Sequence, residues 1–266
     1  MPIAISSVQN PRVKAAVRLR ERRGREEAGL LLIEGYEEVA LAWECGVRPQ
    51  ELFFSPQLAR PQEGELLAAM RQAGVFVLEV TPAVMEKLAY RQSPDGWLAV
   101  APVPRRTLAD LHLGPAPLLV VVEGVEKPGN LGAILRSADA AGVEAVIVCD
   151  PRTDLFNPNV VRASKGTVFQ VPVVQAGSPE TLDWLRRQGV RTVAATPAAT
   201  QLHWQADLRG GIALAVGTEK EGLSGQWLER ADLAVKIPMH GRVNSLNVAQ
   251  ALTVLVYEAL RQRYSG

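Results

Sequence analysis

Three loops in this chain combine glycine with polar side chains of the kinds that bind and orient a polar ligand. They follow apolar runs at residues 118–122, 212–216 and 235–237, which predict buried strands. Their polar side chains include Asn130, Arg136, Glu219 and Glu221, which taken alone are most simply surface groups at the rim of the sheet. Ligands of parallel α/β proteins collect at the carboxyl ends of strands, where helix starts also offer unpaired N–H groups. These loops therefore form the candidate site.

Familiar nucleotide and metal motifs are missing from the three loops. Gly129 and Gly132 do not have the spacing of a dinucleotide fingerprint or of a P-loop. The three histidines are scattered, and the two cysteines do not have a metal-like spacing. Cys149 ends an apolar run, which favours a buried reduced thiol. We expect neither a bound metal nor a disulfide.

Length and composition indicate a globular protein with a substantial core. The chain has 266 residues, of which 47% are hydrophobic, and a formal net charge of +1. Its apolar runs are much shorter than the roughly 18 residues of a membrane span. The first 25 residues resemble no secretory signal, because they contain neither an apolar core nor a cleavage site of small residues. We expect a cytoplasmic protein that is not attached to a membrane.

Alternating apolar runs and helical patterns predict two α/β domains. The first covers residues 1–104, and a proline-dense, extended linker at 105–117 leads to the second, at 118–266. Strands are predicted in the second domain at residues 118–122, 144–149, 168–174, 190–195, 212–216 and 233–237. Helices between them imply a mainly parallel sheet covered on both faces. The final helix should have Ser245 or Asn244 as its N-cap and run to about Arg263.

The first 30 residues hold seven basic and three acidic side chains, a net charge of +4. Asn10 and Pro11 predict the start of a helix whose arginines lie mostly on the outer face. Such a face is either a solvated helix surface or a surface that tracks nucleic-acid phosphates, and the pattern alone leaves both interpretations open.

The three loops together resemble the motifs of the SpoU (TrmH) family of RNA 2′-O-methyltransferases, in the SPOUT superfamily. The first motif is matched by N-L-G-A-I-L-R-S-A-D-A-A-G at residues 130–142, and the second by G-T-E-K-E-G-L-S at 217–224. The third is matched by I-P-M-H-G at 237–241, followed by S-L-N-V at 245–248. The opening segment, with N-P-R-V-K at 10–14 and L-I-E-G at 32–35, resembles the substrate-binding domain of rRNA-modifying members.

This resemblance implies an α/β fold in which an N-terminal RNA-binding domain precedes a SPOUT domain with a deep trefoil knot. It also implies a homodimer packed around the knot and S-adenosylmethionine as the methyl donor. By family position the donor should be surrounded by Thr196, Gly217, Ile237, Met239 and Leu246. Backbone groups of these loops can bind the adenine edge, while Ile237 and Leu246 supply apolar walls.

The resemblance further implies a displacement at the donor methyl carbon by a ribose 2′-oxygen. This hydroxyl must be deprotonated or strongly oriented, and in the family that role belongs to the first-motif arginine, here Arg136. A guanidinium stays protonated and is therefore a poor base, so Arg136 could instead bind the phosphate as a bidentate clamp and lower the pKa of the hydroxyl electrostatically. Asn130 and Glu219 would position Arg136 and the ribose, and Ser245 and Asn247 would shape the pocket. Candidate phosphate contacts, which could also be simple surface charges, are Arg12, Lys14, Arg18, Arg22, Arg162 and Lys165.

The substrate is expected to be ribosomal RNA, by analogy with relatives that carry an N-terminal domain. Two alternatives stay open: a transfer-RNA 2′-O-methyltransferase, and a non-catalytic RNA-binding protein that acts in ribosome assembly. His240, Arg242 and Asn244 stand where many relatives have acidic residues, which should make that loop more attractive to RNA.

Overall fold

The computed structural model describes residues 3–218 and 220–264, which divide between two compact units. The first unit runs to Pro104 and also contains Asp154–Gln170, and the second contains Arg105–Thr153 and the chain from Val171 onward. The segment Asp154–Gln170 thus packs with the first unit, although the predicted second domain spans it in sequence. The segment expected to be an extended linker belongs to the second unit, where a short 3₁₀ turn, η2 (Leu108–Asp110), buries Leu108.

The first unit is built on a five-stranded mixed sheet. Its strands, in spatial order, are β1 (Ile3–Ile5), β4 (Phe76–Val80), β3 (Glu51–Phe54), β5 (Trp97–Pro102) and β2 (Leu30–Glu34). β4 pairs in parallel with β1 and β3, whereas β5 is antiparallel to both of its neighbours. The edge strand β1 was not predicted, because three residues are too short for a periodic pattern to be visible.

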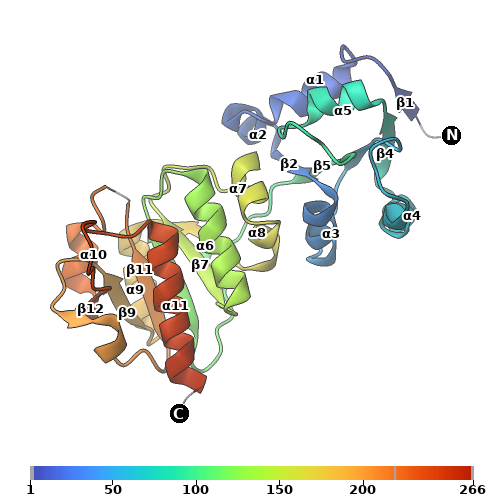
Figure 1. Ribbon diagram of the computed structural model, residues 1–266. Coiled ribbons are helices and arrows are strands. Elements are labelled where there is room, and N and C mark those ends of the chain that lie inside the picture. The colour runs from blue at the N-terminus through green and yellow to red at the C-terminus, as the bar shows by residue number, and fades with distance from the viewer. Residues whose placement is uncertain (1–2, 219, 265–266) are drawn as a thin grey trace. The chain divides into compact units, whose positions relative to one another are not determined.

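Helices cover both faces of this sheet (Figure 1). On one face, α1 (Pro11–Arg18) and α5 (Pro82–Leu88) bury apolar side chains against Phe53 and Leu78. On the other, α3 (Tyr36–Glu44) contacts β2 and β5. The segment Asp154–Gln170, called the returning segment below, adds α7 (Pro158–Ala163) on β2 and α8 (Thr167–Gln170) on α3. The remaining elements are α2 (Arg22–Ala28), the 3₁₀ turn η1 (Pro61–Glu63) and α4 (Gly64–Gln72). The predicted helix start at Asn10 is confirmed, since its side chain accepts a hydrogen bond from the Arg12 N–H.

The second unit contains a seven-stranded sheet in which every neighbouring pair is parallel. Its strands, in spatial order, are β10 (Gln201–Leu202), β12 (Leu233–Lys236), β9 (Arg191–Ala195), β11 (Ile212–Val216), β6 (Leu118–Glu123), β7 (Ala145–Cys149) and β8 (Val173–Ala176). The predicted mainly parallel sheet is confirmed. The three strands β6, β7 and β11 are buried along their whole length, as their continuous apolar runs require.

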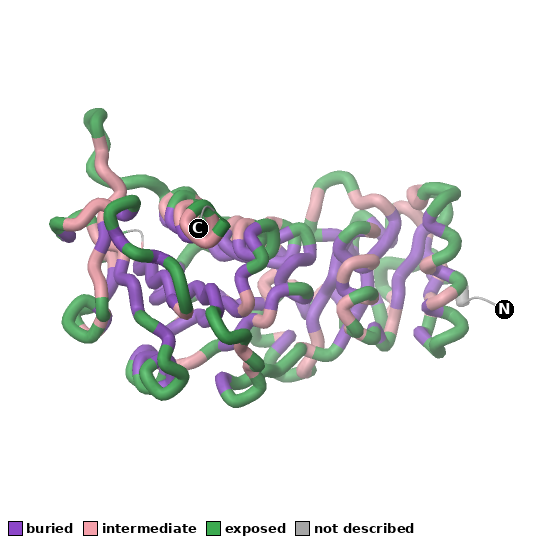
Figure 2. Tube along the Cα trace, turned by 90° about the horizontal axis from the view of Figure 1, so that it is seen from below, coloured by how far each residue is buried: buried purple, intermediate pink, exposed green. Residues whose placement is uncertain are grey.

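Helices also cover this sheet on both faces. α11 (Val248–Tyr264) lies beside α6 (Pro128–Ala140) and packs on β11, as Figure 1 shows in red and green. α9 (Ser178–Arg187) and α10 (Gly225–Arg230) pack together over the apolar cluster that includes Leu119 and Trp227. A further 3₁₀ turn, η3 (His203–Gln205), contacts α11. Figure 2 shows the resulting pattern, in which buried strands are surrounded by helices with exposed outer sides.

Two sequence predictions were wrong in their details. The predicted strand at 168–174 is instead the one-turn helix α8 followed by β8, because an apolar run of this length fits a buried helix turn as well as a strand. The final helix begins at Val248, so its N-cap is neither Ser245 nor Asn244. The Asn247 side chain accepts the Ala249 N–H at 3.0 Å and performs this role.

Arg25 should be a strong determinant of stability in the first unit. Its guanidinium is 3% exposed, donates to the carbonyl oxygens of Leu19 and Arg20, and pairs with Asp154. We expect Arg25→Ala to lower the free energy of unfolding by about 3 kcal/mol, since removing one partner of a buried pair leaves the other groups unsatisfied. Arg23→Ala, at a site that is 89% exposed, should change it by less than about 0.5 kcal/mol. Equal urea midpoints for the two variants would contradict this assignment.

Candidate active site

A cavity of about 340 Å³ lies at the carboxyl ends of β9, β11 and β12. All five residues that the resemblance assigns to the donor line it, namely Thr196, Gly217, Ile237, Met239 and Leu246. The cavity also has walls that were not predicted, from Thr218, Lys220, Glu221, Gly222, Leu223, Leu228, Val248 and Ala251. These extra residues lie in the predicted loops or in the helices that follow them. Their closeness in sequence to the second and third motifs could have identified them.

The loop after β11 forms one wall of this cavity and is tightly folded. Thr218 and Gly222 exchange two backbone hydrogen bonds of 3.0 and 3.1 Å, and the Thr218 hydroxyl accepts the Glu221 N–H. Gly222 has a φ of +72°, a conformation that favours glycine. A Cβ on Gly217 would collide with the backbone of Gly222 and Leu223, so the close approach of the two chain segments requires glycine at position 217.

Glu123, at the end of β6, anchors the far end of the same loop. Its carboxylate is 7% exposed and accepts the Ser224 N–H at 2.7 Å and the Ser178 hydroxyl at 3.2 Å. The indole N–H of Trp227 donates to the same Ser178 oxygen at 2.8 Å. Sequence reasoning missed Glu123, because a carboxylate that ends an apolar run cannot be distinguished from one that faces solvent.

Asn130 and Asn247, 117 positions apart in the chain, meet where α6 and α11 begin. The Asn247 amide nitrogen donates to the Asn130 side-chain oxygen at 3.0 Å, while the Asn247 oxygen caps α11. Further along, the hydroxyls of Ser137 and Thr253 are 2.8 Å apart. These two contacts join the helices side by side and place polar groups from the first and third motifs together.

The other predicted catalytic residues lie in three different situations. Ser245 lines the cavity and is exposed. Arg136 is exposed on α6 and does not line the cavity; within residues 3–218 and 220–264 its guanidinium has no hydrogen-bond or ion-pair partner. Glu219 falls outside the described residues. The structure therefore brings together Asn130 and Asn247, with Ser245 in the cavity wall.

The six predicted RNA-binding residues all belong to the first unit. Four of them form ion pairs with carboxylates: Arg12 with Glu51, Arg18 with Glu27, Arg22 with Glu26, and Lys165 with Glu37. Arg162 donates to the neutral Asn159 side chain at 3.2 Å, and Lys14 is exposed. Exposed ion pairs are worth little, so phosphate could replace the carboxylates. Carboxylates of the first unit therefore neutralise most of the positive charge of these six residues.

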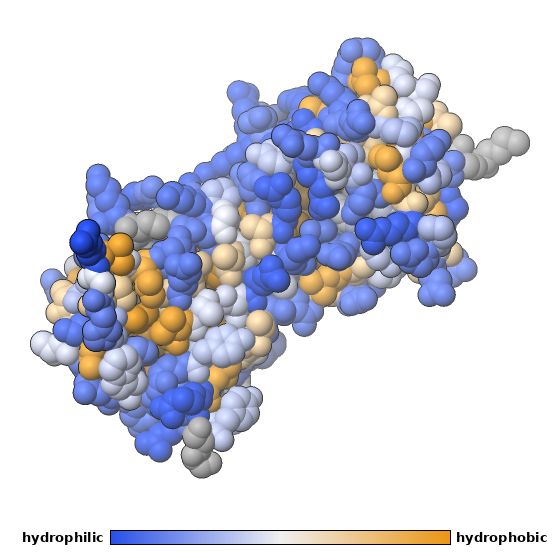
Figure 3. All heavy atoms as spheres, in the orientation of Figure 1, coloured by the Kyte–Doolittle hydropathy of each residue, from blue (hydrophilic) through white to orange (hydrophobic). Residues whose placement is uncertain are grey.

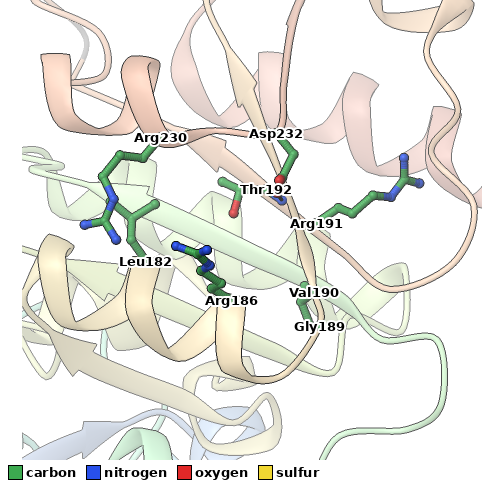
Figure 4. Close-up of a pocket in the computed structure, with 8 residues that line it drawn as sticks. All are labelled: Leu182, Arg186, Gly189, Val190, Arg191, Thr192, Arg230 and Asp232. Atoms are coloured by element: carbon green, nitrogen blue, oxygen red, sulfur yellow. Dashed lines mark hydrogen bonds between the residues drawn. The ribbon is translucent and has the colours of Figure 1, made fainter.

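A second cavity, of about 460 Å³, lies at the opposite ends of the strands (Figure 4). It is bordered by the amino end of β9 and the last residues of α9 and α10, where helix carbonyls carry partial negative charge. Its arginines are partly engaged, Arg230 with Asp183 and Arg191 with the carbonyls of Asp207 and Arg209. In Figure 4 Asp232 points to Thr192, whose N–H it accepts at 2.7 Å. This arrangement stabilises helix ends, and we assign it no ligand.

Within residues 3–218 and 220–264, no group of three or more His, Cys, Asp or Glu side chains is arranged to hold a metal ion. No helix in this part of the chain combines the length and apolar character needed to span a bilayer. Cys149 is a free, buried thiol whose pKa is raised to about 12 by burial, which keeps it protonated and unreactive at neutral pH.

Both units match known protein families. Residues 117–257 match the SpoU rRNA Methylase family, and residues 10–99 match an MRM3-like substrate binding domain. The returning segment Asp154–Gln170 packs with the first unit, but in sequence it lies inside the SpoU match and outside the substrate-binding match.

Individual relatives resemble the chain over nearly its whole length. A 23S rRNA (uridine(2479)-2′-O)-methyltransferase of Streptomyces viridochromogenes is 34% identical, over 93% of this chain and 88% of that protein. A crystal structure of an RNA 2′-O ribose methyltransferase has 44% identity and a TM-score of 0.87, covering 98% of this chain and 100% of the other. An AdoMet-bound rRNA methyltransferase from Sinorhizobium meliloti has 31% identity and a TM-score of 0.90, with 97% of each chain covered.

The position of the helix cap can be tested by stability. We expect Asn247→Ala to lower the free energy of unfolding by about 1 kcal/mol, because α11 loses the side chain that accepts the Ala249 N–H. The predicted but unused cap positions supply controls, and Asn244→Ala and Ser245→Ala should each change it by less than about 0.5 kcal/mol. Urea denaturation decides the matter, and a larger loss at position 244 or 245 than at 247 would refute the assignment.

Proposed function

The chain belongs to the SpoU rRNA Methylase family, and on that basis we propose that it transfers the methyl group of S-adenosylmethionine to a ribose 2′-oxygen of ribosomal RNA. The observation that carries this proposal is the cavity at the ends of β9, β11 and β12, beside the paired Asn130 and Asn247. The chain is an RNA methyltransferase by family, and its solved relative from Sinorhizobium meliloti is bound to AdoMet.

The cavity suits S-adenosylmethionine in size and in chemistry. Its volume lies within the range of small-molecule pockets, and it combines apolar side chains with loop backbone and hydroxyl groups. Ile237 and Leu246 would pack on the adenine, and the loop held by Thr218 and Gly222 would present backbone groups to it. When bound, the donor supplies an activated methyl group on its sulfonium sulfur.

The chain's polar residues would act on the ribose. A free 2′-hydroxyl is a weak nucleophile, so it must be oriented and its pKa lowered. Arg136 is suited to this as a phosphate clamp, because it is exposed and carries a charge that no carboxylate in the described part of the chain compensates. Asn130, Asn247 and Ser245 would orient the ribose by hydrogen bonds. We extend the proposal to Glu219 only through its place in the second motif.

The first unit would bind the RNA. Its match to a substrate binding domain and the basic residues of α1 and α2 support this role. Arg12, Lys14, Arg18 and Arg22 would contact phosphates after exchanging their internal carboxylate partners where these exist. A cytoplasmic location, expected from the sequence, is part of the same proposal.

We also propose that the second unit forms a homodimer and contains the family's knot. The support for a dimer is the exposed apolar side of α11, where Val254 is 38% and Tyr257 48% exposed, with Val243 and Leu246 on the loop before it. Figure 3 shows hydrophobic side chains gathered where α11 runs in Figure 1. For the knot, the support is that α11 follows β12 yet returns to pack on β11 and α6. Tracing the chain through 217–264 in an experimental density map tests the knot.

Catalysis can be tested with 23S rRNA transcripts and S-adenosylmethionine labelled in its methyl group. We expect the wild-type protein to incorporate label into ribose 2′-oxygens, as identified by nuclease digestion and mass spectrometry. Arg136→Ala should lower kcat about 100-fold or more while binding the donor as the wild type does, because the clamp acts on the nucleophile. Arg136→Lys should be intermediate, since lysine keeps the charge and loses the bidentate geometry.

Arg186→Ala is the matched control, because Arg186 is also an exposed helical arginine of the second unit but lines the other cavity. It should retain kcat within about threefold. Wild-type protein that binds 23S rRNA and S-adenosylmethionine without transferring methyl would favour the non-catalytic alternative. Methyl transfer to tRNA and not to 23S rRNA would show that the substrate is transfer RNA.

The dimer can be tested by light scattering during size-exclusion chromatography. The wild type should have twice the mass of one chain, and Val254→Arg combined with Tyr257→Arg should halve it, because two buried cations in an apolar interface are unfavourable. Tyr264→Arg, at a position that is 85% exposed, should leave the mass unchanged. A monomeric wild type would eliminate this interface.

A further inference from the structure

Tyr90 lies on the first unit, in the loop between α5 and β5, with 46% of its surface exposed. Its backbone N–H donates to the Glu34 carboxylate at 2.8 Å, and the next N–H, of Arg91, donates to the same carboxylate at 3.2 Å. Glu34 ends β2 and is 9% exposed. The loop that presents the tyrosine ring is therefore attached to the sheet by a buried acceptor.

Two arginines, Arg91 and Arg20, hold this loop in place. The Arg91 guanidinium lies 3.4 Å from both the Glu34 and Glu38 carboxylates, and 3.7 Å from that of Asp95. Arg20 donates to the carbonyl oxygens that precede Tyr90, at 2.7 Å from Lys87 and 3.2 Å from Leu88. Glu34 and Glu38 are thus buried and paired with Arg91, whereas the Tyr90 ring is exposed, together with Gln92 and Ser93.

The returning segment supplies the neighbours of that ring. Asn159, on α7, donates to the Tyr90 hydroxyl at 2.9 Å, and Arg162 donates to the Asn159 oxygen at 3.2 Å. Arg162 is exposed, and among the described residues it has no carboxylate partner. Four of the other predicted RNA-binding residues do form ion pairs. The cluster of Tyr90, Asn159 and Arg162 therefore presents a fixed aromatic face beside a cation whose charge is not compensated.

We infer that Tyr90, Asn159 and Arg162 form a site that binds one unpaired nucleotide of the RNA substrate. The Tyr90 ring stacks on the base and the Arg162 guanidinium binds a phosphate, which are the two contacts that single-stranded RNA offers irrespective of sequence. Because the ring is already held by its hydroxyl and by the loop contacts, little conformational freedom is lost on binding. Arg162 gives up only a hydrogen bond to a neutral amide, whereas the ion-paired arginines would have to release a carboxylate.

This inference rests on the proposed function for the identity of the partner as RNA. It deepens that proposal, because the nucleotide site combines a loop of the matched substrate binding domain with a helix that lies inside the methylase match. The RNA-binding unit would be completed by α7, and the sequence domain at 10–99 would be insufficient by itself.

Binding of fluorescein-labelled RNA of about 12 nucleotides to the full-length protein tests the site, with single-stranded and duplex forms compared. Tyr90→Ala should weaken binding of the single strand about 5- to 100-fold and leave the duplex nearly unchanged, because only an unpaired base can stack. Tyr90→Phe keeps the ring and should stay within about threefold of the wild type. Arg162→Ala should weaken binding and reduce the slope of log K against log salt by about one.

Arg71→Ala is the matched control, since it removes an exposed cation of the same unit that lies outside α1 and α2. It should bind the single strand within about threefold of the wild type. Unchanged affinity of a folded Tyr90→Ala protein, or an equal loss for the duplex, overturns the site. With 23S rRNA, Tyr90→Ala should raise KM while kcat stays near the wild-type value. If the wild type transfers no methyl, the proposed function fails and the binding comparison still decides the nucleotide site.

Discussion

Backbone hydrogen bonds between parallel neighbours hold β11 between β9 and β6, and β12 beside β9, in a fixed register. Because these strands run in one direction, their carboxyl ends meet at one edge, and the loops that follow them must share the space there. The loop after β11 adapts by the close approach at Gly217 and by the bonds between Thr218 and Gly222. Glu123 then holds its far end, so a buried carboxylate of one strand fixes a loop that follows another.

The order of elements and the parallel sheet could be predicted from the sequence because buried strands such as β6 and β11 are continuous apolar runs. The helix cap could not, since Asn244, Ser245 and Asn247 are all good capping residues within four positions, and only tertiary packing selects the last. The segment 168–174 was ambiguous for a related reason. Its apolar side chains Val168, Phe169, Val171, Val173 and Val174 are all buried, and a run of buried positions has no period that separates a helix turn from a strand.

The five residues that the resemblance assigns to the donor all line one cavity. Contacts between segments distant in sequence were beyond prediction. The bond between Asn130 and Asn247 depends on α6 and α11 lying side by side, and no local pattern carries that information. The net charge of the first 30 residues was likewise a poor measure of available charge. Partners such as Glu51, which lies far along the chain, compensate part of it.

One consequence of the returning segment concerns the order of synthesis. The first unit has its whole sheet after residue 102, but Asp154, α7 and α8 emerge only when the chain has passed through β6, α6 and β7 of the second unit. At bacterial and eukaryotic elongation rates this interval lasts roughly 3 to 13 seconds. During that time Arg25 has no Asp154, and the side of β2 and α3 that α7 and α8 cover is exposed. The two units are thus interleaved in time, and the first to begin folding is not complete until the second is partly made.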